Sequence, residues 1–323
     1  MTPLTLLLGD CRETLKTLPD GSVNCCVTSP PYFGLRDYGT EDQMGLEDTP
    51  DAFVEGLVNL FREVHRVLRD DGTVWLNLGD SYSGSGKGRN ADGSHQEGGK
   101  QGTSRGTIEG KLLKTATPDC KAKDLIGIPW RVAFALQADG WYLRQDIIWH
   151  KPNPMPESVR DRCTKAHEYI FLLSKAPKYY FDSEAMKEPA IYAGDNRGAR
   201  GDKRRGTECN SMSGVTGEFR NKRSVWTVTT KPYKGAHFAT FPPDLIEPCV
   251  LAGCPVGGTV LDPFGGSGTT AGVAIKHGRN AVLCELSQEY VHLIPDRISK
   301  ISGRPADEFT PVIREALLAD YEA

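Results

Sequence analysis

One stretch near the carboxyl end constrains the fold of this chain more than any other. A short apolar run at 259–261 leads into the nine residues DPFGGSGTT at 262–270, a helical pattern follows, and a second apolar run at 281–284 ends in Glu285. Strand, glycine-rich turn, helix and strand in this order predict a parallel α/β unit whose turn binds a ligand. No Lys follows Gly268, which argues against a P-loop. Glu285, by contrast, is placed to accept hydrogen bonds from ribose hydroxyls.

The first 180 residues show the same alternation of apolar runs and helical spacing. Strands separated by helices predict a doubly wound, mostly parallel sheet. Asp70-Asp71-Gly72 is expected to end the longest helix. The expected strands are 4–8, 23–28, 73–78, 141–149 and 169–173, and the expected helices are 50–69 and 129–138.

Two segments lack apolar periodicity and are expected to be loop-rich insertions. The first, 81–120, is rich in Gly, Ser and Lys, and the second, 183–235, has a similar composition. They divide the chain into a first catalytic part at 1–80, the insertion 81–120, the remaining catalytic sheet at 121–182, the insertion 183–235 and a cofactor-binding part at 236–323.

The second insertion is basic on a chain whose net charge is -3. Within 197–223, eight basic and three acidic residues give a net charge of +5. Such asymmetry favours a loop that contacts DNA phosphates, although a solvated loop without a partner has the same composition. The candidate DNA-binding residues are Arg197, Arg200, Lys203, Arg204, Arg205, Arg220, Lys222 and Arg223.

The tetrapeptide Ser29-Pro30-Pro31-Tyr32 follows the expected strand 23–28. Two prolines fix the backbone, so carbonyls and the Ser29 hydroxyl are held as acceptors for an amino group. Tyr32 offers a flat face on which a base can stack. An exocyclic amino nitrogen of cytosine or adenine is a poor nucleophile because its lone pair is delocalised into the ring. Fixed acceptors that take hydrogen bonds from its N–H groups favour the pyramidal nitrogen, whose lone pair can attack the methyl group of a sulfonium. These four residues are therefore the candidate catalytic residues.

The composition excludes several other classes of protein. Hydrophobic residues make up 38% of the 323 residues, enough for the core of an α/β domain with insertions. None of the nine cysteines forms a C-x-x-C pair, so no zinc or other metal site is expected. No apolar run is long enough to span a bilayer and the first residues do not resemble a signal peptide. A cytoplasmic protein is expected; the resemblance described below implies that a prokaryote or phage encodes it.

Together these motifs resemble the amino-methyltransferases of bacterial and phage DNA, in the permuted order called the beta group. The matching segments are TSPPY at 28–32, WHKPNPMP at 149–156, HEYIFLLSK at 167–175, HFATFP at 237–242 and DPFGGSGTT at 262–270. The resemblance implies a seven-stranded mixed sheet of the methyltransferase type, S-adenosyl-L-methionine as cofactor, and double-stranded DNA as partner with the target base flipped out of the duplex.

The resemblance also implies which residues bind the cofactor. Asp10 and Cys11 are expected near its adenine, His237 and Phe241 beside its methionine moiety, and Glu285 on its ribose. The remaining cofactor-binding residues are Asp262, Phe264, Gly265, Gly266, Ser267, Gly268, Thr269 and Thr270. His150 is interpreted as a structural histidine rather than a general base, and His167 and Glu168 as core and network residues.

Several alternatives stay open. In the family, Ser at the position of Ser29 is typical of enzymes that methylate cytosine N4, so that atom is the preferred target and adenine N6 is the alternative. Related loops with Asn before Pro-Pro-Tyr act on RNA or protein, and a decayed, non-catalytic DNA-binding module is a further possibility. The recognised DNA sequence, a cognate restriction endonuclease and the choice between monomer and homodimer are not determined.

Overall fold

A nine-stranded sheet forms the centre of the protein. The computed structural model describes residues 4–35, 43–83, 120–190, 218–231, 240–309 and 312–315. The sheet strands are β1 (Leu4–Leu8), β2 (Val23–Thr28), β3 (Leu68–Leu78), β4 (Tyr142–His150), β5 (His167–Ser174), β8 (Val225–Thr227), β9 (Thr259–Asp262), β10 (Asn280–Glu285) and β11 (Val312–Glu315). The helices are α1 (Cys11–Thr14), α2 (Pro50–Val67), α4 (Ile128–Ala138), α5 (Pro243–Gly253), α6 (Thr269–Lys276), α7 (Gln288–Val291) and α8 (Ile294–Ser302), with 3-10 turns at Leu15–Thr17 and Ala306–Phe309.

The strand order is β11-β1-β10-β9-β2-β3-β5-β4-β8. Every neighbouring pair is parallel except β3 with β5 and β4 with β5. This arrangement confirms the doubly wound, mostly parallel sheet. The count differs from the expected seven because two short strands, β11 and β8, are added at the edges; they have four and three residues, too few for a periodic pattern in the sequence.

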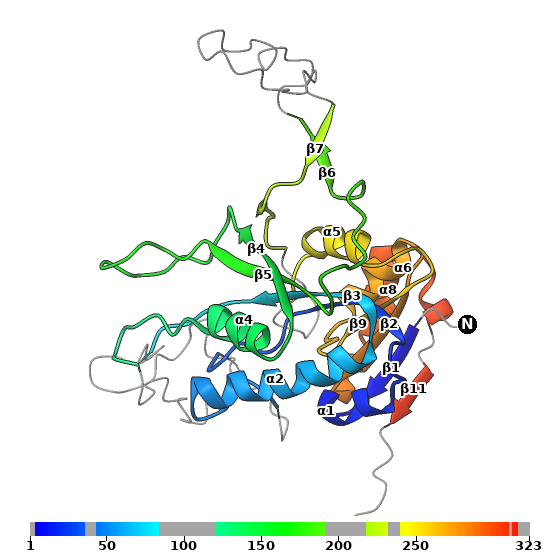
Figure 1. Cartoon of the computed structure of the whole chain (residues 1–323), viewed down its shortest axis with the longest axis horizontal. Coiled ribbons are helices and arrows are strands. Elements are labelled where there is room, and N and C mark those ends of the chain that lie inside the picture. Colours follow the sequence, from blue (N-terminus) through cyan, green and yellow to red (C-terminus); the bar gives the residue numbers. More distant parts are fainter. Residues whose placement is uncertain are drawn as a thin grey trace, which may run out of the picture.

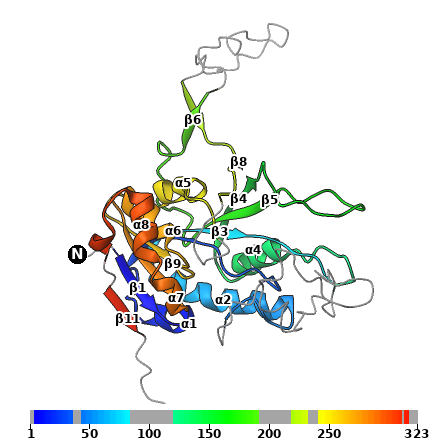
Figure 2. The same ribbon diagram turned by 180° about the vertical axis from the view of Figure 1, so that it is seen from behind.

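Helices cover both faces of the sheet and bury a separate core on each (Figures 1 and 2). One core packs α2 and α4 against the sheet, and the other packs α5, α6 and α8. Successive residues of β2 alternate between them: Cys26 belongs to the first core, and Cys25 and Val27 belong to the second. Because both sides of the strand are buried, its sequence is apolar throughout rather than alternating.

The longest helix, α2, begins and ends close to where its sequence predicts. Thr49 caps its start by accepting a hydrogen bond from the Ala52 amide at 3.1 Å, and Pro50 occupies the first turn. Its buried side chains recur at helical spacing and include Phe53, Leu57 and Val64. This apolar stripe faces the sheet, so α2 forms most of one outer layer.

The prediction that Asp70-Asp71-Gly72 ends this helix is wrong. The helix ends at Val67, and β3 begins at Leu68 and runs through the acidic pair. The register between β2 and β3 shifts between Val23 and Cys25, so the extra residues are accommodated as an irregularity in the ladder.

A two-stranded antiparallel ribbon lies in the predicted insertion 183–235. It consists of β6 (Lys187–Pro189) and β7 (Phe219–Asn221). The ribbon projects away from the sheet and its helices (Figures 1 and 2). Of the predicted insertion 81–120, only residues 81–83 and 120 belong to the described part. Among the described helices, none is both long and apolar enough to cross a bilayer.

Candidate functional site

Five parallel strands end at one edge of the sheet, and most of the predicted site residues gather there. The strands β1, β10, β9, β2 and β3 are neighbours that run in the same direction. Asp10 follows β1, Glu285 ends β10, the glycine-rich loop follows β9, and Ser29 begins the loop after β2. In open α/β sheets, ligands bind outside these carboxyl ends.

Asp262 joins the two loops that the sequence analysis singled out. Its carboxylate is 2% exposed and accepts hydrogen bonds from the hydroxyls of Thr28 and Thr270, both at 2.6 Å. The Phe264 amide donates a third bond at 3.1 Å. Burial raises the pKa of Asp262, and the two threonine hydroxyls oppose that rise. Both carboxylate oxygens thus face protein groups, and the carboxylate holds the glycine-rich loop against β2.

The glycine-rich loop packs so closely that side chains would not fit at two positions. A Cβ at Gly265 would lie 2.9 Å from the Cβ of Leu283, and the Gly265 amide donates to the Cys284 carbonyl at 2.8 Å. Gly268 has a φ of +87°, and a Cβ there would lie 2.9 Å from Ile294. The loop backbone therefore runs against β10 and α8, and it continues directly into the buried start of α6.

Glu285 is the second buried carboxyl group at this edge. Its two oxygens accept hydrogen bonds from the Gly266 amide at 2.7 Å and the Ser287 amide at 2.8 Å. Burial raises the pKa of Glu285 to about 7, and the amide donors oppose this. Each carboxylate oxygen has a further lone pair, so the group can still accept from ligand hydroxyls. Nearby in the loop, the buried Ser267 hydroxyl has no hydrogen-bond partner among the described residues.

Three other predicted cofactor-binding residues belong to the described structure, and they lie at the starts of α1 and α5. Asp10 caps α1 by accepting from the Arg12 amide at 2.8 Å and also pairs with the Arg12 guanidinium. Cys11 is buried, which raises the pKa of its thiol. Phe241 lies just before α5 and packs against the core beneath that helix. His237 lies outside the described residues.

The proline-rich loop ends in a tyrosine whose position is fixed by other strands. Pro30 is buried and Ser29 is half-buried. The Tyr32 hydroxyl donates to the Glu168 carboxylate at 2.7 Å and lies 3.2 Å from the Asn77 side-chain oxygen. Glu168 also pairs with Lys151. These contacts place Glu168 between Tyr32 and Lys151.

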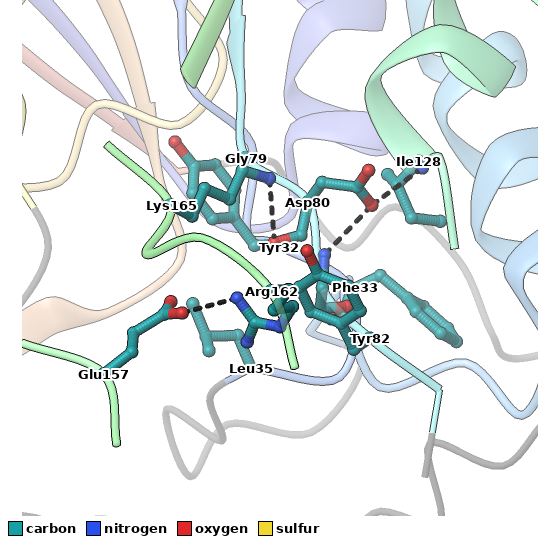
Figure 3. Close-up of a pocket in the computed structure, with 11 residues that line it drawn as sticks. Tyr32, Phe33, Leu35, Gly79, Asp80, Tyr82, Ile128, Glu157, Arg162 and Lys165 are labelled. Atoms are coloured by element: carbon teal, nitrogen blue, oxygen red, sulfur yellow. Dashed lines mark hydrogen bonds and ion pairs between the residues drawn. The ribbon is translucent and has the colours of Figure 1, made fainter. Parts of the chain in front are cut away.

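A pocket of about 120 Å³ lies beside Tyr32 (Figure 3). Asp80 lines it and accepts from the Gly127 and Ile128 amides at 3.0 and 3.1 Å, which caps the start of α4. Burial lowers the pKa of Lys165, whose ammonium donates to the Asp80 carbonyl at 3.4 Å. The lining residues are Tyr32, Phe33, Leu35, Gly79, Asp80, Ser81, Tyr82, Ile128, Glu157, Arg162 and Lys165.

The connection between β4 and β5 closes one side of this pocket. Arg162 lies over the Tyr82 ring, with its guanidinium carbon 4.0 Å from the ring centroid, and pairs with Glu157 at 2.6 Å. No role is predicted from the sequence for Asp80, Lys165 or Arg162. For Lys165 and Arg162, the signal that could have found them is the group of charges after WHKPNPMP, because that segment connects two strands beside the proline-rich loop.

His150 lies at the end of β4, where its Nδ1 is 3.1 Å from the Thr227 hydroxyl. This contact ties β4 to its edge neighbour β8. The interpretation of His150 as structural stays a prediction. His167 starts β5 and packs edge-on against Tyr169, with ring centroids 5.4 Å apart. Burial lowers the pKa of His167.

The structure describes three of the predicted DNA-binding residues, and they lie on the β6–β7 ribbon or directly after it. Arg220 lies on the β6–β7 ribbon and pairs with Glu188 at 2.8 Å. Lys222 lies 5.3 Å from the Trp226 ring centroid, and Arg223 is exposed. The remaining five, Arg197, Arg200, Lys203, Arg204 and Arg205, lie outside the described residues.

Comparison with known proteins agrees with this geometry. Residues 23–296 match a family model described as DNA methylase. The chain is 48% identical over 295 residues to the type II methyltransferase M.Cfr9I of Citrobacter freundii, covering 91% of this chain and 87% of that protein. It is 48% identical over 293 residues to M.SmaI of Serratia marcescens, covering 91% and 90%. The solved PvuII DNA methyltransferase (cytosine-N4-specific) superposes with a TM-score of 0.60 at 17% identity and 95% coverage of both chains.

Proposed function

The chain belongs to the DNA methylase family, and on that premise we propose that it transfers a methyl group to the N4 amino nitrogen of cytosine in double-stranded DNA. The observation that supports this most is the junction of the two loops. Thr28, the residue before the proline-rich loop, donates to Asp262, the first residue of the glycine-rich loop, at 2.6 Å. A bond between residues 234 positions apart holds a cofactor loop beside a loop of amino-group acceptors.

S-adenosyl-L-methionine is the methyl donor, and when bound it supplies an electrophilic methyl carbon on a sulfonium. The residues at the carboxyl edge fit this molecule. Glu285 retains lone pairs for ribose hydroxyls, and the Ser267 hydroxyl is buried without a partner among the described residues. Gly265 and Gly268 face Leu283 and Ile294, so their lack of side chains lets the loop backbone pack against β10 and α8.

In the proposed reaction, the residues Ser29, Pro30 and Pro31 hold acceptors around the amino group of the flipped base. Their oxygens accept the N–H hydrogens and stabilise the positive charge that builds on nitrogen. The nitrogen forms a bond to the methyl carbon as the carbon–sulfur bond breaks, and the nitrogen then loses a proton to a neighbouring oxygen or solvent. Tyr32 supplies the ring against which the base lies.

The choice of cytosine N4 rests on Ser29. A serine hydroxyl both donates and accepts, so it serves an amino group and the adjacent ring nitrogen of cytosine. Adenine N6 is the second candidate because adenine has an equivalent ring nitrogen. Replacing Ser29 with Ala should lower turnover far more than cofactor affinity in either case, since the contact matters in the transition state.

DNA binding is assigned to the basic insertion. The candidate residues are Arg197, Arg200, Lys203, Arg204, Arg205, Arg220, Lys222 and Arg223, and each phosphate contact should contribute about one unit of salt dependence. Arg220 already pairs with Glu188, so it would have to exchange that partner for a phosphate. The type II names of the relatives support a cognate restriction endonuclease as a partner in the cell.

The proposal is tested by offering labelled S-adenosyl-L-methionine with double-stranded DNA, with RNA or with protein. We expect label in DNA alone. Label in RNA alone or in protein alone would show that the enzyme acts on another class of substrate. Equilibrium dialysis with the labelled cofactor separates an inactive DNA-binding module, which would retain none, from an enzyme offered the wrong DNA sequence.

A further inference from the structure

The orientation of Tyr32 is set by residues on two neighbouring strands, β3 and β5, rather than by its own loop. Its hydroxyl donates to Oε2 of Glu168, at the start of β5, at 2.7 Å. Asn77, near the end of β3, lies 3.2 Å from the same hydroxyl and donates from Nδ2 to the Tyr169 carbonyl at 3.0 Å. The phenol is therefore held by side chains that are themselves tied to the sheet.

Glu168 is held in turn from its other oxygen. Oε1 pairs with the Lys151 ammonium, and the two side chains are only 15% and 18% exposed. The Lys151 ammonium also lies 4.2 Å from the centroid of the Trp149 ring. With one oxygen on Lys151 and the other on Tyr32, the carboxylate cannot turn without breaking a charge-assisted bond.

Packing restrains the ring as well as the hydroxyl. A Cβ placed on Gly79 would lie 2.4 Å from Cε2 and 2.8 Å from Cδ2 of Tyr32. The ring is thus pressed against the backbone at the end of β3, which has no side chain at this position. The ring edge and its hydroxyl are therefore both held by contacts within the protein.

We propose that Glu168 is a positioning residue for methyl transfer, acting through the Tyr32 hydroxyl to fix the ring against which the target base lies. This inference rests on the proposed function. Transfer to a weak nucleophile needs the amino nitrogen aligned with the methyl carbon, and small misplacements are costly in rate. A tyrosine without this anchor would rotate and let the base move, while cofactor binding at the glycine-rich loop would be unaffected.

A double-mutant cycle tests this coupling. Tyr32→Phe keeps the ring and removes the hydroxyl, and Glu168→Gln keeps the shape and removes the charge. Each should lower kcat on DNA by about tenfold while leaving the dissociation constant for S-adenosyl-L-methionine within about twofold. The double variant should be no more than about twofold slower than the slower single variant, because the second change removes a contact already lost. Glu247→Gln, which removes the charge of an acid paired with Lys276 at 2.7 Å on α5 and α6, is the control and should keep full activity.

The results of this cycle distinguish a failure of the inference about Glu168 from a failure of the proposed function. Effects that multiply to about a hundredfold in the double variant, or full activity of Glu168→Gln, would overturn the inference while leaving the enzyme class intact. Loss of cofactor affinity or of thermal stability in Glu168→Gln in step with the loss of kcat would assign Glu168 a purely structural role and also overturn it. A wild-type protein that transfers no methyl group to DNA would overturn the proposed function and this inference with it.

Discussion

The two threonines that donate hydrogen bonds to the buried carboxylate of Asp262 are predicted to contribute unequally to the stability of the protein. Thr270 donates to Oδ2 at 2.6 Å, and no other hydrogen bond to that oxygen is found among the described residues. Thr28 donates to Oδ1 at 2.6 Å, but Oδ1 also accepts from the Phe264 amide at 3.1 Å. Replacing either threonine with valine keeps the branched shape and removes only the donor.

The two substitutions should therefore differ in cost. Thr270→Val leaves a buried carboxylate oxygen without a donor, and we expect the free energy of unfolding to fall by about 2 to 3 kcal/mol. Thr28→Val leaves the Phe264 amide in place and should cost about 1 kcal/mol. Burial already raises the pKa of Asp262, and losing a hydroxyl raises it further. Since the ionised form is the one left unsatisfied, the cost of Thr270→Val should be greater at pH 8 than at pH 5.

Urea denaturation at both pH values measures these differences. Thr17→Val is the matched control, because the Thr17 hydroxyl donates to the Thr14 carbonyl at 2.7 Å on an exposed residue. Its cost should stay below about 0.5 kcal/mol. If Thr270→Val costs no more than Thr28→Val or Thr17→Val, Oδ2 of Asp262 does not depend on the Thr270 hydroxyl as its donor.

Three further predictions concern the cofactor, the target base and DNA. Burial raises the pKa of Glu285 from 4.5 to about 7, so its carboxyl ionises at lower pH in the unfolded chain, and the ligand-free protein should lose stability as the pH rises between these values. The ionised carboxylate is the better acceptor for ribose hydroxyls, so the affinity for S-adenosyl-L-methionine, measured by calorimetry, should rise up to about tenfold from pH 6 to 8. An affinity that does not change with pH would contradict the role of Glu285. Gly79→Ala should displace the Tyr32 ring and lower kcat about tenfold or more with little change in cofactor affinity. Gly56→Ala is the control and should keep full activity, because its Cβ would meet only the flexible end of Met44 at 3.3 Å. Equal activities of the two variants would refute the close packing of Gly79 against Tyr32. Arg204→Ala combined with Arg205→Ala should reduce the salt slope of DNA binding by about two, and an unchanged slope would mean that this part of the insertion is only solvated.

Much of the fold could be predicted from the sequence because its signals are local. The helix Pro50–Val67 has a cap, a proline at its start and a periodic apolar face. The strand Val23–Thr28 is buried on both sides, so its composition alone identifies it. The strand β8 could not be predicted, because its three residues leave no pattern and only pairing with β4 creates it.

Part of the candidate site could likewise be predicted from the sequence, and part of it is created only by the fold. The glycine-rich loop and the proline-rich loop are each continuous in sequence, so their chemistry is visible there. The contacts that fix them are not: Thr28 reaches Asp262 only because β9 inserts beside β2, and Glu168 reaches Tyr32 only because β5 pairs antiparallel with β3. The two threonine donors of Asp262 likewise come from β2 and α6, so the pair could not be identified from the glycine-rich loop alone.

The measurement that tests the central claim most directly is the identity of the methylated nucleoside. The protein is incubated with S-adenosyl-L-methionine and genomic DNA that lacks methylated amino groups, the DNA is digested to nucleosides, and the products are identified by mass spectrometry. We predict N4-methyldeoxycytidine as the methylated product, formed by the wild type and strongly reduced in Ser29→Ala. N6-methyldeoxyadenosine as the only product would contradict the assignment of the target atom, and the absence of any methylated nucleoside would contradict the proposed activity.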